Sequence, residues 1–404
     1  MNVLFLSPGF PAEMPLFVRG LAEVGAKVYG VGDQPASALP AAARQGLTDY
    51  LQVRWGDDDG VIDAVREWLR GKSIDRVESM WETQMLMAAR LREAFSVPGM
   101  TVAETLPFRD KETMKSVVEK AGLRVPRHAR ATTRKEAWEA VEKVGYPAIV
   151  KPIAGAGSKD TYRCNDKEEF ERNLQRTERI VELSVEEYID GEELTFDTVC
   201  ADANVLYQSV SWYRPRVLDM VNNPWISMQN VVLRDPAIPM ATPGVELGRG
   251  VLEALGFRTG FTHMEWFLKP DGEAVFGEIG ARAPGARLVH AMNYACDIDL
   301  FKAWAHAVCH GSLGQEVERK YNAAMVFKRA QGQGLVRRYD GLAALMSDFG
   351  EHVANLELTP IGEPRRDWQK VVVGDGWIVV RHPDLEFTTQ MADRFCSDLQ
   401  VVAE

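Results

Sequence analysis

Residues 260–278 are the most informative stretch of the chain and read GFTHMEWFLKPDGEAVFGE. Two apolar runs flank Asp271-Gly272, a pair that is typical of a tight turn between antiparallel strands. A two-residue turn at this point places position 269 opposite 274, position 267 opposite 276, and Glu265 opposite Glu278. We therefore expect a β-hairpin that carries two glutamates side by side on one face.

Two glutamates whose Cβ atoms lie about 5 Å apart bring their carboxylates close enough to repel, so this pairing needs a physical explanation. A shared proton or a divalent cation would remove the repulsion. Mg²⁺ suits the pair best, because it binds carboxylate oxygens and keeps positions for phosphate and water. The alternative is that both glutamates face solvent, but Phe267 and Phe276 are expected on the same face and argue against it. A register slip of one residue would separate the two acids.

Arg282 follows the second strand of the expected hairpin by a few residues. A guanidinium at this place is suited to hold a phosphate or carboxylate through two hydrogen bonds. An ion pair with Glu265 or Glu278 is the structural alternative, and it is compatible with the first role.

The chain has 404 residues, 46% of them hydrophobic, and a formal net charge of −11. This composition is typical of a globular protein with several structural units. The acidic balance argues against a nucleic-acid or membrane-surface partner. No apolar run approaches the roughly 20 residues of a membrane helix, and the N-terminus predicts a strand rather than a secretory signal. Five cysteines without CxxC spacing indicate reduced thiols and a cytoplasmic location.

Strand and helix signals alternate over the first hundred residues, which predicts a Rossmann-like parallel sheet. The first loop, Ser7-Pro8-Gly9, lacks the GxGxxG pattern of dinucleotide enzymes. We expect an α/β and α+β multidomain protein with units at residues 1–103, 104–190, 191–319 and 320–404. Residues 213–244 are rich in Pro and Asn and predict a long loop.

Four further motifs precede the hairpin. Asp110-Lys111 stands at a helix start, and Lys151 ends the apolar strand predicted over residues 146–151. A glycine loop, Gly155-Ala-Gly157-Ser158-Lys159, follows that strand. The acidic segment 186–193 contains an Asp-Gly turn. Each motif alone is common, and it is their order that is specific.

With the hairpin, these motifs resemble the ATP-grasp superfamily of carboxylate–amine ligases over residues 104–313. The resemblance implies an ATP-grasp fold preceded by the parallel-sheet domain, and a site for ATP and Mg²⁺. The implied nucleotide residues come from the four motifs before the hairpin: Lys111, Lys151, Gly155, Gly157, Ser158, Glu186, Glu187, Ile189 and Glu193. Among them, Glu186 would bind the adenine amino group, the backbone of Glu187 and Ile189 the ring edge, and Glu193 the ribose.

The resemblance also implies that Glu265 and Glu278 hold the metal, as two Mg²⁺ ions that Mn²⁺ can replace, and that Lys151 and Arg282 act in catalysis. The sequence departs from the family pattern at Gly280, which stands where an asparagine usually helps to bind the second metal. Water or a bridging Glu278 is then needed to hold that ion.

A two-step reaction is what the resemblance implies. A substrate carboxylate attacks the γ-phosphorus of ATP to give an acyl phosphate, and an amine then displaces phosphate to give an amide. We expect small amino-acid-type substrates and, from the family, a homodimer. Five side chains are candidates for substrate contacts: Glu82, Arg214, Arg216, His263 and Arg287.

Two alternatives remain open at this stage. A biotin-carboxylase-like or nucleotide-biosynthesis enzyme would share the nucleotide site and use bicarbonate or a phosphorylated amine. A domain that binds the nucleotide without catalysing a reaction is the other alternative, and it would account for Gly280 in place of the usual asparagine.

Overall fold

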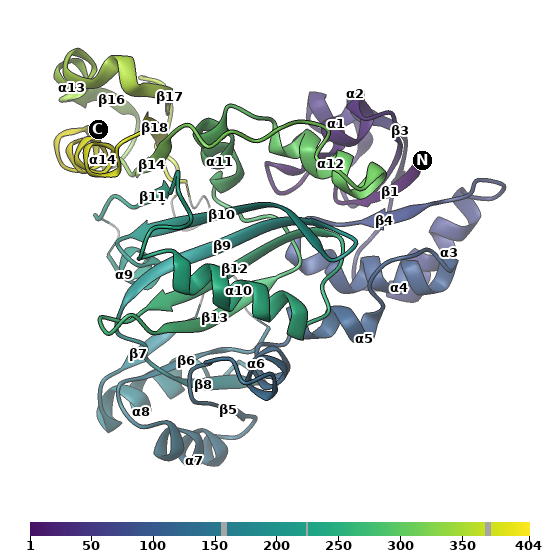
Figure 1. Cartoon of the computed structure of the whole chain (residues 1–404), viewed down its shortest axis with the longest axis horizontal. Helices are drawn as coiled ribbons and strands as arrows, with labels where there is room; N and C mark the ends of the chain where they lie inside the picture. The colour runs from purple at the N-terminus through teal and green to yellow at the C-terminus, as the bar shows by residue number, and fades with distance from the viewer. Residues whose placement is uncertain (155–159, 224, 368–372) are drawn as a thin grey trace.

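The computed structural model describes residues 1–154, 160–223, 225–367 and 373–404. The chain forms a parallel sheet near its N-terminus, a small antiparallel sheet, and a large antiparallel sheet that crosses the middle of the molecule (Figure 1). The expected α/β and α+β multidomain fold class is therefore confirmed. No described helix has both the length and the apolar character needed to cross a membrane.

The N-terminal region contains a four-stranded parallel sheet in the order β3-β2-β1-β4. Val3–Leu6 of the central strand β1 are fully buried, because helices cover the sheet and leave its centre no access to water. The elements are β1 (Asn2–Leu6), α1 (Met14–Glu23), β2 (Lys27–Gly32), α2 (Ala41–Gly46), β3 (Leu47–Gln52), α3 (Asp58–Trp68), β4 (Arg76–Glu78), η2 (Glu82–Gln84) and α4 (Met85–Phe95).

A second, antiparallel sheet has the order β5-β8-β6-β7 and carries helices α7 and α8 (Figure 1). Helix α6 leads into it and begins directly after Asp110, whose carboxylate accepts hydrogen bonds from the amides of Glu112 and Thr113. The elements are α5 (Val102–Thr105), η3 (Leu106–Phe108), α6 (Lys111–Lys120), β5 (His128–Ala131), α7 (Arg134–Val144), β6 (Ala148–Pro152), β7 (Tyr162–Cys164), α8 (Lys167–Arg176) and β8 (Leu183–Glu187).

The third sheet has eight strands in the order β13-β12-β9-β10-β11-β14-β18-β17 and is antiparallel throughout. Helix α10 covers one face, and α11 and α12 cover the other. The elements are β9 (Glu192–Ala201), β10 (Asn204–Arg214), α9 (Val217–Asn222), β11 (Gln229–Val232), α10 (Thr242–Ala254), β12 (Gly260–Leu268), β13 (Ala274–Gly280), α11 (Leu288–Cys296), α12 (Leu300–His310) and β14 (Asn322–Lys328).

The long loop predicted over residues 213–244 is wrong in part, because this segment contains helix α9 and strand β11. Strand β11 has four residues, all buried, and lies inside the large sheet between β10 and β14. Its short apolar run was hidden among the prolines and asparagines that flank it.

The C-terminal residues contribute strands β17 (Val353–Leu358) and β18 (Gly376–His382) to the large sheet. They also form a separate three-stranded sheet in the order β15-β19-β16. Strands from both sides of residue 320 thus share one sheet, and the proposed division into four units stays a prediction. The remaining elements are β15 (Gln331–Gly332), β16 (Val336–Asp340), α13 (Leu342–Phe349), α14 (Leu385–Asp398) and β19 (Gln400–Ala403).

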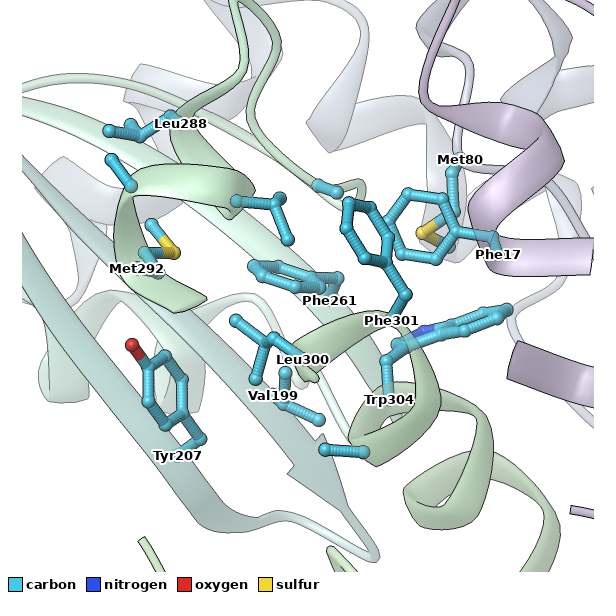
Figure 2. Close-up of a cluster of buried hydrophobic side chains, with 14 of the residues drawn as sticks. Phe17, Met80, Val199, Tyr207, Phe261, Leu288, Met292, Leu300, Phe301 and Trp304 are labelled. Atoms are coloured by element: carbon cyan, nitrogen blue, oxygen red, sulfur yellow. The ribbon is translucent and has the colours of Figure 1, made fainter. Parts of the chain in front are cut away.

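The N-terminal region is joined to the large sheet by an aromatic cluster (Figure 2). Phe17 of α1 meets Phe301 and Trp304 of α12 with ring centroids 4.9 and 5.1 Å apart. The edge-to-face geometry of both pairs is favourable for aromatic rings. Helix α12 also packs on Val199 and Phe261 of the large sheet, so one helix connects both regions.

Replacing Trp304 by alanine should lower the free energy of unfolding by about 3–5 kcal/mol, because it leaves a large cavity between the two regions. Chemical denaturation followed by circular dichroism measures this loss. Trp225, which is 76% exposed, is the matched control, and Trp225→Ala should change stability little. Equal effects of the two substitutions would contradict the proposed role of the cluster.

Candidate active site

The β12–β13 hairpin places Glu265 directly opposite Glu278, as the sequence predicted. The register nearer the turn differs from the prediction, because Phe267 pairs with Val275 rather than with Phe276. The turn has three residues instead of two: the amide of Lys269 donates to the carbonyl of Glu273, and Gly272 adopts a positive φ of 87°. The predicted two-residue turn is therefore wrong, while the glutamate pair is confirmed.

A β-bulge at Gly277 brings the two glutamates back into register. A Cβ atom at Gly277 would lie 2.7 Å from the carbonyl oxygen of Glu265, so a side chain does not fit there. The bulge also turns Phe276 into the core beneath α10, where it is fully buried. The expectation that Phe267 and Phe276 share the face of the glutamates is wrong for Phe276.

Lys111, the first residue of α6, reaches across to the hairpin. Its Nζ lies 2.6 Å from Oε2 of Glu278, and the lysine is 7% exposed. Burial alone would raise the pKa of Glu278, but the charges of Lys111 and Lys151 outweigh it and lower this pKa to about 2. Glu278 is therefore held as a carboxylate.

Glu186 on β8 is held between two lysines. Its Oε2 lies 2.9 Å from Nζ of Lys151, and its Oε1 lies 2.8 Å from Nζ of Lys115 and accepts a hydrogen bond from Ser184 (2.7 Å). Burial opposes ionisation of Glu186, but the two lysines lower its pKa far below the usual value. Burial also acts on Lys151, yet Glu186 and Glu278 raise its pKa. Both shifts favour the charged forms of Glu186 and Lys151.

Glu193 at the start of β9 is a third acid beside the hairpin. It is 6% exposed and accepts a hydrogen bond from the amide of Val217 (3.0 Å). Burial and the nearby charge of Glu265 raise the pKa of Glu193 to about 8. Arg216 lies 3.9 Å away and gives it only partial compensation. Negative charge is thus in excess where these acids meet.

These groups line one pocket between the antiparallel β5-β8-β6-β7 sheet and the β9–β12–β13 part of the large sheet. The pocket is open to solvent. Charged side chains from both sheets and apolar ones share its wall: Lys111, Lys151, Glu186, Glu187, Ile189, Glu193, Arg216, Leu218, Glu265, Phe267 and Glu278.

The acidic segment 186–193, which was predicted to bind adenine, already uses part of its hydrogen-bonding capacity within the protein. The amide of Glu187 already donates to the carbonyl of Arg127 (2.8 Å), and its carboxylate binds Arg124 (3.1 Å). The carbonyl of Ile189 accepts a hydrogen bond from Arg216 (2.9 Å). The predicted phosphate loop, with Gly155, Gly157 and Ser158, lies outside the described residues.

Arg282 leaves the hairpin and binds Glu82 of the N-terminal region through Nε and Nη2 (3.0 and 2.7 Å). Glu82 also binds Arg109, so a single carboxylate holds two guanidinium groups. A Cβ atom at Gly280 would lie 3.2 Å from Cγ of Arg282. The Arg282 side chain therefore passes through space that an asparagine at position 280 would crowd.

The structure brings only some of the substrate candidates to the pocket. Arg216 lines it, with its guanidinium 4.8 Å from the centre of the Phe267 ring. His263 lies beside Glu265, its Nε2 3.4 Å from Oε1. Arg214 instead points towards α14, where it binds Asp393 (3.2 Å). Arg287 stacks 4.8 Å above the ring of Trp377 on β18.

Two charged residues beside the site were missed from the sequence. Lys115, which is fully buried, lies one helical turn after Lys111 on α6, and this spacing was a usable signal. Asp197, also fully buried, follows Glu193 and Thr195 at alternate positions of β9, which places all three on one face of the strand. Burial lowers the pKa of Lys115 despite the charge of Glu186.

The described residues contain no group of three or more His, Cys, Asp or Glu side chains arranged to hold a metal ion. The pair Glu265 and Glu278 nevertheless fits Mg²⁺, which proteins often bind through one or two carboxylates together with substrate phosphates. Burial and then the charge of Glu265 raise the pKa of Glu193, and a cation at the pair would offset that charge.

Residues 108–213 match a family model described as an ATP-grasp domain. The chain carries an ATP-grasp domain. The resemblance inferred from the motifs is therefore confirmed, and the ATP-grasp region includes Lys111, Lys151, Glu186 and Glu193 but ends before the hairpin.

The chain is also similar to individual ATP-grasp relatives. An L-arginine-specific L-amino acid ligase of Bacillus subtilis is 25% identical over 273 residues, which are 63% of this chain and 64% of the relative. The matched part thus spans slightly less than two thirds of that relative. The crystal structure of an L-amino acid ligase from Bacillus licheniformis superposes with a TM-score of 0.79 at 19% identity, covering 100% of this chain and 98% of the other.

A third relative is the N5-carboxyaminoimidazole ribonucleotide synthetase of Thermotoga maritima. Its crystal structure has a TM-score of 0.70 at 19% identity and covers 100% of this chain and 99% of that one. At this level of identity the two solved structures establish the fold alone.

Replacing Gly277 by alanine should disrupt the bulge and turn Glu278 away from Glu265, because the new Cβ would clash with the backbone of Glu265. Mn²⁺ binding in the presence of ADP, measured by electron paramagnetic resonance, should weaken at least about tenfold. Gly285, around which a Cβ would find open space, gives the control Gly285→Ala. Unchanged Mn²⁺ binding in Gly277→Ala would contradict the role of the bulge.

Replacing Glu186 by glutamine should lower the free energy of unfolding by about 3–5 kcal/mol at pH 7, because it leaves two buried lysines without their carboxylate. The folded protein lowers the pKa of Glu186 below its usual 4.5, so the wild-type advantage is complete above that pH and shrinks as the pH falls below it. Urea denaturation from pH 7 to pH 3 measures this trend. A difference that grows with acidity would contradict it.

Proposed function

We propose that this chain is an ATP-dependent carboxylate–amine ligase that joins small amino-acid-type substrates and releases ADP and phosphate. The observation that carries the proposal is the opposition of Glu265 and Glu278 across from Lys111 and Lys151 in the ATP-grasp pocket. Such a site concentrates both signs of charge where a triphosphate and its metal would lie. The relatives named as L-amino acid ligases support the choice of substrate class.

In the first step, a carboxylate oxygen of the substrate attacks the γ-phosphorus of ATP, and the bond from that phosphorus to the bridging oxygen breaks to release ADP. Lys111 and Lys151 would bind the phosphates, and charge neutralisation of this kind is the main requirement of phosphoryl transfer. Mg²⁺, held by Glu265 and Glu278, would supply further positive charge on the phosphate oxygens. We propose two such ions, with Mn²⁺ as a substitute.

In the second step, the amine nitrogen attacks the acyl carbon, loses a proton and expels phosphate, which leaves an amide. Arg282 is the proposed partner for the acyl phosphate and for the oxyanion that follows. Its position depends on Glu82, which binds its Nε and Nη2. A substrate carboxylate near Arg282 would therefore compete with Glu82, and Glu82 would then be available for a substrate ammonium group.

We assign the nucleotide end of the pocket to the side formed by the antiparallel β5-β8-β6-β7 sheet. We propose that Glu186 and the backbone of Ile189 bind the adenine and that Glu193 binds the ribose. Glu193 is suited to this role because the raised pKa, about 8, leaves a carboxyl group that can both donate and accept hydrogen bonds. The loop with Gly155, Gly157 and Ser158 is the proposed cover for the β- and γ-phosphates.

The second candidate function is an ATP-dependent carboxylation with bicarbonate as the acid. The observation in its favour is the similarity in fold to the N5-carboxyaminoimidazole ribonucleotide synthetase of Thermotoga maritima. It would use the same nucleotide pocket. We also propose a cytoplasmic location, because all five cysteines are unpaired.

The ligase proposal predicts that ADP and phosphate release depends on added amino acids, as measured with pools of amino acids in a coupled assay. Glu265→Gln and Glu278→Gln should each lower turnover about 100-fold or more, because the charge that holds the cation is lost. Glu273→Gln, on the same hairpin but paired with Lys269, is the matched control and should retain activity.

Other products would separate the alternatives. Dependence on bicarbonate rather than amino acids would favour the carboxylation, and nucleotide binding without ADP release would favour a module without turnover. AMP and pyrophosphate as products would contradict the acyl-phosphate mechanism.

A further inference from the structure

Four polar side chains form a square on the pocket-facing side of β9 and β12. Glu265 pairs across the strands with Thr195, and His263 pairs with Asp197. Hydrogen bonds join three of them in a row: Oγ1 of Thr195 donates to Oδ2 of Asp197 (2.5 Å), and Oδ1 of Asp197 lies 2.6 Å from Nδ1 of His263. The other ring nitrogen, Nε2, lies 3.4 Å from Oε1 of Glu265.

Burial makes this row unusual. Thr195 and Asp197 are fully buried, and His263 is 7% exposed. In the described parts of the chain, His263 is the only ion-pair partner of Asp197, and no arginine or lysine forms an ion pair with it. A buried carboxylate is costly unless it is paired, and a buried pair of this kind seldom adds net stability. A contribution to the site is therefore the better explanation of why β9 carries an acid here.

The row ends at one of the two glutamates proposed to hold the metal. Asp197 fixes the orientation of the imidazole through Nδ1, which leaves Nε2 directed at Glu265. The side chain of Glu265 is 27% accessible, about the same as the 28% of Glu278. Groups that fix the side chains of metal ligands in this way commonly alter metal affinity when they are removed.

We propose that Asp197 and His263 are positioning residues that hold the carboxylate of Glu265 in place for the divalent cation. This inference rests on the proposed function, since it assumes that Glu265 and Glu278 bind the metal. It assigns His263 a contact with Glu265 in place of the substrate contact considered from the sequence. It also gives a role to Asp197, which the sequence motifs did not identify.

The test measures Mn²⁺ binding to the ADP-bound protein by electron paramagnetic resonance, for Asp197→Asn, His263→Phe and the double variant. Each single substitution should weaken Mn²⁺ binding about 10–100-fold. The double variant should bind about as weakly as the weaker single variant, because the two residues act as one unit. ADP binding without metal should stay within about twofold of the wild type.

Thr198→Val supplies the control for a purely structural effect. Thr198 lies on the opposite face of the same strand, is fully buried and bonds Thr262 across to β12 (2.6 Å). This variant should lose thermal stability without losing Mn²⁺ affinity. If the Mn²⁺ affinity of all variants followed their thermal stability, Thr198→Val included, the positioning role would be wrong.

The outcomes also separate this inference from the proposed function. Wild-type protein that binds Mn²⁺ with ADP, while Asp197→Asn and His263→Phe bind it equally well, would overturn the positioning role alone. Wild-type protein that binds no Mn²⁺ in the presence of ADP would overturn the metal site itself. Should His263→Phe fail to fold, Asp197→Asn, which keeps the size of the side chain, decides the question.

Discussion

Repulsion between Glu265 and Glu278 is the constraint around which the pocket is arranged. The hairpin holds the two side chains opposite each other, and Glu193 adds a third acid nearby. Lys111 compensates Glu278 directly, whereas Lys151 is shared between Glu278 and Glu186. The protein's own cations thus offset part of the negative charge, while burial, together with the charge of Glu265, raises the pKa of Glu193 to about 8.

The scaffold enforces this arrangement from two sides. On the hairpin, Gly277 forms the bulge that brings Glu278 into register with Glu265, and no larger residue fits beside the Glu265 carbonyl. Lys111 of α6 and Lys151 of the antiparallel β5-β8-β6-β7 sheet approach the acids across the pocket. The pocket therefore needs both sheets, and Arg282 extends the network to Glu82 in the N-terminal region. Charge pairs of this kind couple three parts of the chain that are distant in sequence.

The sequence predicted those parts of the site that depend on local spacing. The parallel sheet, the hairpin and the Glu265–Glu278 pair follow from alternation and turn residues, and Lys111 follows from a helix start. The turn length was wrong, because Pro270 and the positive φ of Gly272 extend the loop by one residue, and only the bulge at Gly277 restored the expected pairing. The longer turn and the bulge shift the register in opposite directions, so Glu265 still pairs with Glu278 as predicted.

What the sequence could not predict depends on long-range contacts. Asp197 reads as one polar residue in a strand until the pairing of β9 with β12 places it against His263. Strand β11 is hidden between proline-rich segments and becomes recognisable only through its neighbours in the sheet. The direction taken by Arg214, towards Asp393 near the C-terminus, likewise depends on tertiary packing.

The most direct test of the account is anomalous X-ray diffraction from crystals grown with Mn²⁺ and a non-hydrolysable ATP analogue. The account predicts Mn²⁺ between the carboxylates of Glu265 and Glu278 and the phosphates of the analogue. A bound analogue with Mn²⁺ absent from these two side chains would contradict it.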